Sequence, residues 1–158
     1  MKTLPHHLAT LAVTAWVGAL WSIGYLAVPV LFNAQADRQL AGMLAGEMFL
    51  AVGYLGMTCG TYLLTYHLAI SGRAALRSAT FRIIAAMLLT TLALQYAIQP
   101  LMAELKAQAL PLEVMHSAFA QQFRMLHGIS SLTYLAQSLL AALLVVKLNG
   151  ARTPRTGE

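Results

Sequence analysis

The sequence predicts an all-α integral membrane protein, a four-helix bundle with an amphipathic helical segment before the last span. Of the 158 residues, 59% are hydrophobic and only 9% are charged, whereas a soluble domain carries about a quarter charged residues. A membrane-spanning helix needs roughly 20 apolar residues. Stretches of at least this length that lack Asp, Glu, Lys and Arg are residues 3–36, 48–72, 83–103 and 125–146.

The first predicted helix, residues 8–32, has two unusual features. Pro29 lies near its outer end and removes a backbone donor there, which favours a kink. Trp21 falls close to the middle of the span, although tryptophan is enriched at membrane interfaces. We therefore expect the indole N–H of Trp21 to find a partner inside the bundle.

The second predicted helix, residues 44–70, is marked by small residues at helical spacing. Gly42 and Gly46 form one pattern, Gly56 and Gly60 form a second, and Gly53 lies one turn before the second. Such spacing leaves a flat groove in which another backbone can approach closely. Two interpretations stay open: a tight helix contact within the bundle, or a seam between two copies of the chain in a homo-oligomer.

The third predicted helix, residues 82–103, is expected to stop near Gln99 and Pro100. The connection from there to His127 is too long for a bare loop. Apolar residues repeat along it at helical spacing, at Leu112, Met115, Phe119, Phe123 and Leu126. This pattern predicts an amphipathic segment that lies on the outer membrane surface or runs directly into the fourth helix, residues 127–147. The polar tail, residues 149–158, is predicted to be a disordered cytoplasmic segment.

The charged residues predict a topology. With four spans, one side carries Lys2, Arg73, Arg77, Arg82, Lys147, Arg152 and Arg155. The opposite side carries Arg38, Lys106 and Arg124, offset by Asp37, Glu104 and Glu113. The positive-inside rule therefore predicts a multi-pass protein of a bacterial inner membrane with both termini cytoplasmic. No nucleic-acid motif accompanies the formal charge of +5, so the lipid bilayer, and not nucleic acid, is the expected partner.

Glu47 is the only acidic residue well inside an apolar stretch. Ionisable residues within membrane helices are costly, and each is a candidate for function. Glu47 lies near the outer end of the second helix, a few residues inside Arg38. It is predicted either to contribute to a functional site or to pair at the interface with Arg38 or Arg124.

Two of the five histidines, His116 and His127, and most of the methionines lie toward the outer side. Met115 adjoins His116, and Met125 lies two residues before His127. Thioether plus imidazole is a ligand set that suits Cu(I), whereas methionine also fills gaps in apolar helices. On one continuous helix His116 and His127 would share a face about 16 Å apart. One ion could then bind both only if the segment bends.

Haem is a second cofactor candidate. His7 and His67 lie near the cytoplasmic ends of the first two helices and could supply two axial ligands. Histidines are common at membrane interfaces, however, and the spacing does not determine which way these two face. Copper and haem are therefore both candidate cofactors.

The fourth helix carries a polar face. His127, Ser131, Tyr134 and Ser138 step by four, three and four residues, and Gln137 widens the strip at the depth of Gln95 in the third helix. Such groups can hydrogen-bond across a bundle, each worth about 0.6 kcal/mol in a membrane. A strip this continuous could instead line a hydrated path, so both interpretations stay open.

Three segments resemble the bacterial members of the transmembrane protein 205-like family of unknown function. They are TAWVGALWSIGYLAVPVLF, RQLAGMLAGEMF and FRMLHGISSLTYL. The last segment is also similar, more loosely, to the copper-resistance D-like membrane proteins. The resemblance implies a four-helix membrane protein without an assigned reaction or ligand site, and an animal relative linked to platinum-drug tolerance and vesicle traffic. The motif positions that carry over are Trp16, Gly18, Pro29, Phe123, His127, Gly128 and Ser131.

No catalytic motif is found, with neither a Ser/His/Asp constellation nor HExxH, paired carboxylates or a phosphate loop. The sequence therefore predicts a non-enzymatic membrane protein that handles, or confers tolerance to, a small solute or soft metal ion. Its predicted site near the outer face comprises Glu47, Arg124, Met125 and His127, with support from His116. The alternatives are a haem-binding redox or assembly component, including a haem-dependent oxidoreductase, and a structural membrane subunit.

Overall fold

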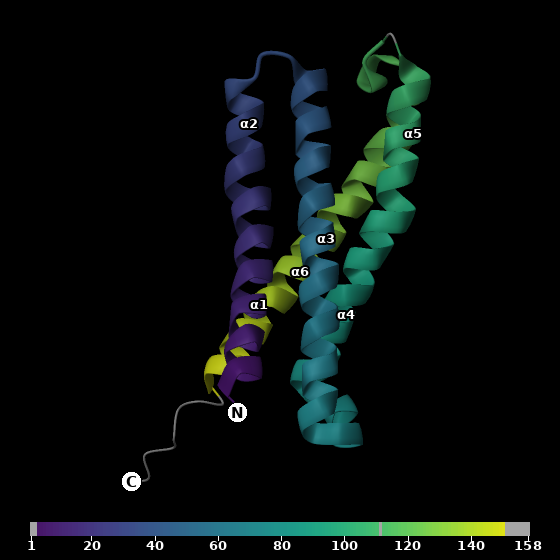
Figure 1. The fold of residues 1–158 in the computed structure, drawn as a ribbon. Coiled ribbons are helices and arrows are strands. Elements are labelled where there is room, and N and C mark those ends of the chain that lie inside the picture. The colour runs from purple at the N-terminus through teal and green to yellow at the C-terminus, as the bar shows by residue number, and fades with distance from the viewer. Residues whose placement is uncertain (1–2, 111, 151–158) are drawn as a thin grey trace.

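The computed structural model describes residues 3–110 and 112–150, and every regular element in these residues is helical. In chain order they are α1 (Thr3–Ser22), the π-helical turn η1 (Ile23–Ala27), α2 (Val28–Ala34), α3 (Arg38–Ser71), the 3₁₀ turn η2 (Gly72–Arg77), α4 (Ala79–Ala93), the π-helical turn η3 (Leu94–Ile98), α5 (Gln99–Ala109), the 3₁₀ turn η4 (Val114–His116) and α6 (Ala120–Gly150). Figure 1 shows long helices that pass up and down the molecule, with α6 crossing obliquely toward the start of α1.

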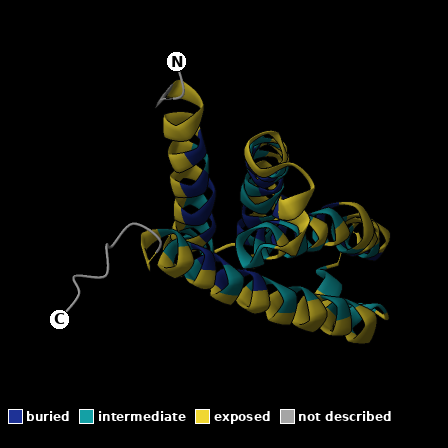
Figure 2. Cartoon of the chain, turned by 90° about the horizontal axis from the view of Figure 1, so that it is seen from below, coloured by how far each residue is buried: buried dark blue, intermediate teal, exposed yellow. Residues whose placement is uncertain are grey.

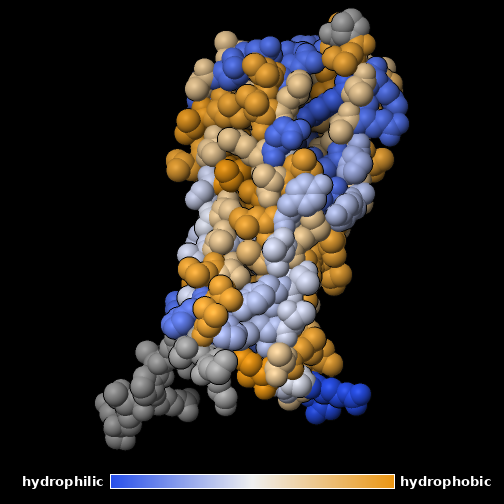
Figure 3. Space-filling view, in the orientation of Figure 1, coloured by the Kyte–Doolittle hydropathy of each residue, from blue (hydrophilic) through white to orange (hydrophobic). Residues whose placement is uncertain are grey.

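Within the described residues, four helical segments are long and apolar enough to cross a membrane, which confirms the predicted fold class. These segments are Leu4–Ala34, Arg38–Arg77, Ala79–Ala109 and Ala120–Gly150. The predicted spans 8–32, 44–70, 82–103 and 127–147 each lie within one of them. On the face drawn in Figure 3, strongly hydrophilic residues gather at the two ends of the molecule. The chain is thus a multi-pass membrane protein.

Local hydrogen bonds define where the helices begin. The Asp37 side chain caps α3 by accepting from the backbone N–H groups of Gln39 and Leu40, at 2.9 and 3.0 Å. The Ser78 hydroxyl caps α4 in the same way by accepting from the Phe81 N–H, at 3.1 Å. Both caps satisfy backbone donors that the first turn of a helix leaves unpaired. At the end of α3, Gly72 takes a φ of 54°, a conformation that favours glycine.

A π-helical turn precedes Pro29 and Pro100, the two prolines that lie beyond the first turn of a span. At the end of η1 the Val28 N–H bonds the carbonyl of Ile23, five residues back. The wider turn accommodates the proline ring and its missing donor without ending the helix. The prediction that the third helix stops near Gln99 and Pro100 is therefore wrong. The chain continues as α5 to Ala109.

The amphipathic segment before the last span is divided between two elements. Met115 and His116 lie in η4, whereas Phe123 and Leu126 already belong to α6. The predicted apolar pattern thus runs directly into the last span only from Ala120 onward. The one continuous helix that would have placed His116 and His127 on a common face is not formed. Of the tail predicted to be disordered, residues 149 and 150 end α6, and residues 151–158 lie outside the described residues.

The core lies among α1, α3, α4 and α6. The largest fully buried side chains are Trp16, Leu20, Leu63, Ile84, Met87 and Leu144. Figure 2 shows buried residues along the inward sides of the helices and exposed residues along the outward sides. Many of the exposed residues are large and apolar, such as Leu132 and Leu139, as expected for surfaces that contact lipid tails.

The glycines of α3 receive side chains from two neighbouring helices. The indole of Trp16, in α1, lies on Gly56 and Gly60: a Cβ atom at these positions would be 2.5 Å from Nε1 and 3.0 Å from Cη2. The Gln95 side chain, from η3, lies on Gly53, where a Cβ atom would be 2.8 Å from Cδ. These three glycines therefore serve a tight contact inside the bundle, the first of the two interpretations.

The tryptophan that enters the core is Trp16 and not Trp21, which remains 39% exposed. The expectation that Trp21 needs a partner inside the bundle is wrong, because α1 is oriented so that Trp16, and not Trp21, faces the core. The Trp16 Nε1 and Gln95 Nε2 atoms are buried without a hydrogen-bond partner among the described residues. Close packing on the glycines thus takes precedence over satisfying these two donors.

Replacing Gly56 with alanine is expected to destabilise the protein by about 1–3 kcal/mol, the usual cost of overpacking. The added methyl group would meet the Trp16 indole, which is fully buried. Gly46→Ala is the matched control on the same helix, because a Cβ atom at Gly46 has nothing within 4 Å. Thermal unfolding in detergent measures both variants. Equal melting temperatures for the two would contradict the glycine-face contact.

Candidate functional site

The charged residues predicted to meet near the outer face are not paired with one another. Glu47 lies in α3 and is exposed. Arg38 and Arg124 each donate to a backbone carbonyl of a nearby residue in the chain, at 3.0 and 3.3 Å. Among residues 3–110 and 112–150, the one ion pair joins His116 and Glu113. Neither arginine therefore forms the predicted interfacial pair with Glu47.

His127 lies on the exposed side of α6. Its ring stacks on that of Phe123, with centroids 6.0 Å apart and planes at 12°. The Ser131 hydroxyl donates to the His127 backbone carbonyl, at 2.8 Å, so its hydrogen bond stays within α6. The hydrogen bond and the ring stacking both stay within α6, and neither draws His127 toward Glu47.

The predicted metal ligands are divided between η4 and α6. His116 is exposed, with Nδ1 3.6 Å from an oxygen of Glu113. Met115 and Met125 are 46% and 61% exposed. The described part of the chain has no group of three or more His, Cys, Asp or Glu side chains that could hold a metal ion.

The polar face of α6 forms structural hydrogen bonds. The half-buried Tyr134 hydroxyl donates to the backbone carbonyl of Leu20 in α1. Gln137 Nε2 donates to the hydroxyl of Thr91 in α4, at 2.7 Å, and both side chains are buried. Ser138 donates to the Tyr134 carbonyl. Because the bonds of Tyr134 and Gln137 join α6 to α1 and α4, they support structural bonding, the first of the two interpretations of this face.

Lys106 makes a tertiary contact that the sequence did not indicate. Its ammonium group donates to the backbone carbonyl of Gly42 in α3, at 3.2 Å. The same group lies 5.6 Å from the centroid of the Phe123 ring in α6. A half-buried cation from α5 thus joins α3 and α6 near the end predicted to face outward, and ring faces attract such a cation.

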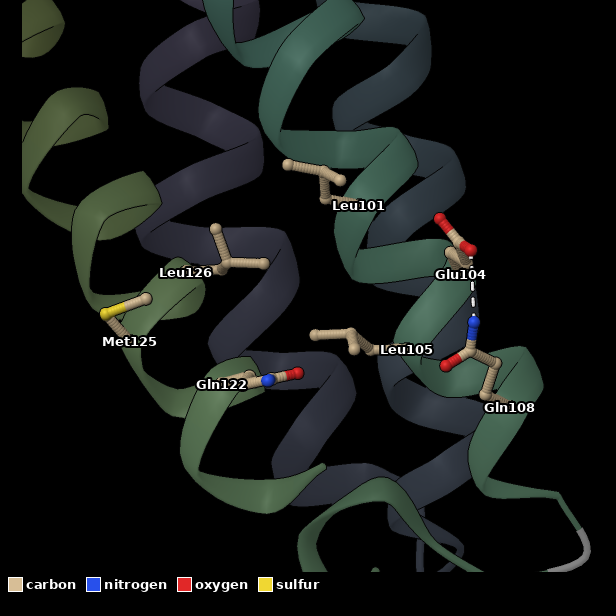
Figure 4. Close-up of a pocket in the computed structure, with 7 residues that line it drawn as sticks. All are labelled: Leu101, Glu104, Leu105, Gln108, Gln122, Met125 and Leu126. Atoms are coloured by element: carbon tan, nitrogen blue, oxygen red, sulfur yellow. Dashed lines mark hydrogen bonds between the residues drawn. The ribbon is translucent and has the colours of Figure 1, made fainter. Parts of the chain in front are cut away.

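A groove of about 330 Å³ lies between α5 and α6. We call it the α5–α6 groove; its lining residues are Leu101, Glu104, Leu105, Gln108, Gln122, Met125 and Leu126. Figure 4 shows the leucine side chains pointing into the space between the helices, with Glu104 and Gln108 at one edge. The Gln108 amide donates to the Glu104 carboxylate, at 3.0 Å. An apolar floor with a carboxylate and amides at its rim suits a small amphiphilic molecule.

Only Met125 of these lining residues belongs to the site predicted from the sequence. The others were missed because the third helix was expected to stop near Pro100, which left Glu104 and Gln108 in an irregular connection. Their spacing of four residues is a helical signal that would have placed them on one face of a longer helix. Pro100 nevertheless favoured the end of the helix, because the sequence did not predict the π-helical turn that lets the helix continue.

The candidate haem ligands lie on neighbouring helices. His7 is exposed in α1 and His67 is half-buried in α3. Each contacts a different aromatic ring, His7 that of His6 and His67 that of Tyr66. The two predicted ligands thus lie on adjoining helices at one end of the bundle, and neither ring contact joins them to each other.

Four helical segments long and apolar enough to cross a membrane, with a small polar-rimmed groove between α5 and α6, define a multi-pass helical membrane protein. The chain belongs to the family described as Domain of unknown function (DUF4149), whose model matches residues 11–111. This match supports an uncharacterised membrane family, the coarser part of the resemblance. The match does not by itself support the likeness to the transmembrane protein 205-like or copper-resistance D-like families, which stays a prediction. No curated protein and no solved structure matches the chain.

Lys106→Met is expected to loosen the packing of α5 against α3 and α6. It keeps the apolar stem and removes the ammonium group, so the loss should be about 1.5–3 kcal/mol, the range for a hydrogen bond to a charged group. Arg124→Met is the matched control, since Arg124 is exposed and its one hydrogen bond to a described residue is to the carbonyl of Ala120 in its own helix. Unfolding in detergent by urea compares the two. Equal stability of both variants would refute the role of Lys106.

Proposed function

We propose that this protein is a non-enzymatic membrane protein that binds a small amphiphilic cation in the α5–α6 groove. The observation that carries the proposal is the groove itself, which combines an apolar floor with the Glu104 carboxylate at its rim. Its volume of about 330 Å³ is at the small end of ligand sites in proteins. A solute of modest size, handled near the outer membrane face, fits such a site.

Charge favours a cationic solute. Glu104 is exposed at the rim and accepts one hydrogen bond, from Gln108. No described residue forms an ion pair with it. At a membrane interface, where the surroundings are less polar than water, an unpaired carboxylate attracts a positive group more strongly than it would in bulk solvent. The apolar part of the solute would rest against Leu101, Leu105 and Leu126.

The proposal narrows the alternatives drawn from the sequence. It follows the small solute and not the soft metal ion, because the groove contributes one thioether, that of Met125, and no histidine. The structural-subunit alternative relied on the glycines of α3, and Gly53, Gly56 and Gly60 are already covered within the chain. A tolerance role, suggested by the resemblance to the transmembrane protein 205-like family, agrees with capture of a membrane-active cation.

Glu104→Gln is expected to weaken binding of benzyltrimethylammonium about tenfold, which corresponds to about 1.4 kcal/mol. The substitution keeps the shape of the side chain and one acceptor oxygen for the Gln108 amide, and it removes the charge. Isothermal titration of the purified protein in detergent provides the measurement. Neopentylbenzene, the uncharged isostere, should bind the variant and the unaltered protein equally.

Glu47→Gln is the matched control for this experiment. Glu47 is also an exposed carboxylate, and it does not line the groove. Its substitution should leave the affinity for benzyltrimethylammonium unchanged. The same loss of affinity in both variants would point to general surface charge and would defeat the proposal.

We further propose the orientation given by the positive-inside rule, with both termini cytoplasmic in a bacterial inner membrane. In a Cys59→Ala background, Ala36→Cys lies in the α2–α3 connection and Ala74→Cys lies in η2, both exposed. A membrane-impermeant maleimide should label Ala36→Cys in intact cells and Ala74→Cys only after permeabilisation. The reverse pattern would invert the topology and place the groove on the cytoplasmic side.

A further inference from the structure

Histidine and tyrosine side chains gather where the start of α1 meets the end of α3. This group, the His–Tyr cluster, consists of His6, His7, Tyr62, Tyr66 and His67. It lies at the end of the bundle opposite the α5–α6 groove (Figure 1). The proposed solute site makes no use of it.

Hydrogen bonds and ring contacts hold the cluster together. The Tyr66 hydroxyl and His6 Nδ1 are hydrogen-bonded at 3.2 Å, across 60 residues of sequence. The Tyr62 hydroxyl donates to the Pro5 carbonyl, at 3.0 Å. The Tyr62 and Tyr66 rings stack, with centroids 6.2 Å apart and planes at 19°. The cluster is therefore an ordered aromatic surface that joins the two helices.

Two imidazoles of the cluster keep unused hydrogen-bonding capacity. His7 and His67 make ring contacts, to His6 and Tyr66. Their ring nitrogens form no hydrogen bond with the described residues. Each neutral imidazole offers one N–H donor and one acceptor nitrogen. The cluster thus presents donors beside flat rings, and it contains no lysine, arginine, aspartate or glutamate.

An apolar groove leads along the helices to this cluster. It lies between α1 and α3, has a volume of about 380 Å³, and is lined by residues that include Leu8, Leu11, Ala15, Thr58 and Tyr62. We call it the α1–α3 groove. Tyr62 belongs to both the groove and the cluster. On α1, Leu11 follows His7 by one helical turn, so these two side chains are also neighbours.

We propose that the α1–α3 groove and the His–Tyr cluster together bind an isoprenoid quinone. Its apolar tail lies along the groove, and its ring lies at the cluster, where the carbonyl oxygens accept hydrogen bonds from imidazole N–H groups. Aromatic rings favour stacking with a flat ring. A phospholipid headgroup would call for lysine or arginine beside its phosphate, and the five residues of the cluster, within the part of the chain that the structure describes, include neither. The neutral, aromatic, donor-bearing end of the groove therefore selects a quinone.

A photoreactive azido-benzoquinone with a decyl tail tests this site on the full-length protein in lipid nanodiscs. Cross-links mapped by mass spectrometry should concentrate on residues 4–15 and 58–67. Ala15→Leu, which fills the groove from an exposed position, should reduce this labelling about tenfold. Thr58→Leu fills the opposite wall and serves as the second variant if the first does not fold. Ala103→Leu, an exposed position on α5 outside the groove, is the matched control and should label normally.

Three results would overturn the proposal. Labelling spread over all four spans in proportion to their exposure would show simple partition of the probe into lipid. Unchanged labelling of the filled-groove variants would place the quinone elsewhere. A Soret band in the purified protein that disappears in His7→Leu or His67→Leu would assign the cluster to haem. None of these results bears on Glu104, so the experiment is independent of the proposed solute site.

Discussion

The contact between Trp16 and the glycine face of α3 is the constraint on which the rest of the bundle depends. Gly56 and Gly60 leave space for the whole indole, which is fully buried there. Gln95 fills the next space along the same face, at Gly53. Lipid tails are as apolar as leucine, so hydrophobic burial does little to hold membrane helices together, and close packing has to do it. The three glycines make this closeness possible between α3 and the helices on either side.

Two π-helical turns allow spans that contain proline to continue as helices. Without η3 the third span would end near Pro100, and α5 would not exist as a helix facing α6. The α5–α6 groove and the contacts of Lys106 both depend on that extension, since Leu101, Glu104 and Lys106 all lie beyond the proline. A backbone irregularity in the middle of the membrane thus determines which side chains meet at its edge.

The candidate site was predictable only in part. Composition and helical period correctly indicated a polar face on α6, and the structure uses it for bonds such as Tyr134 to Leu20 and Gln137 to Thr91. Glu47 was predicted because ionisable groups in apolar surroundings are costly, and His127 because it lies beside Met125 at the start of a polar face, yet both are exposed. Burial of a charge depends on which way its helix faces, and the glycine contact sets that rotation for α3. Lys106 was interpreted as a surface charge. Its hydrogen-bond partner is the backbone carbonyl of Gly42, and every residue has such a carbonyl, so the sequence gives no sign of this contact.

The sequence by itself determined the number of spans, the glycine spacing of α3 and the asymmetry of charge between the two sides. Each of these follows from local composition, because a bilayer requires about 20 apolar residues wherever a helix crosses it. Only the tertiary structure decided that Trp16 and not Trp21 enters the core, that Gln95 fills the space at Gly53, and that Glu104 lies across a groove from Met125. These outcomes depend on how helices rotate and cross against one another. In a chain that is apolar almost all round, the helical period marks no single buried face, so packing between neighbours has to choose it.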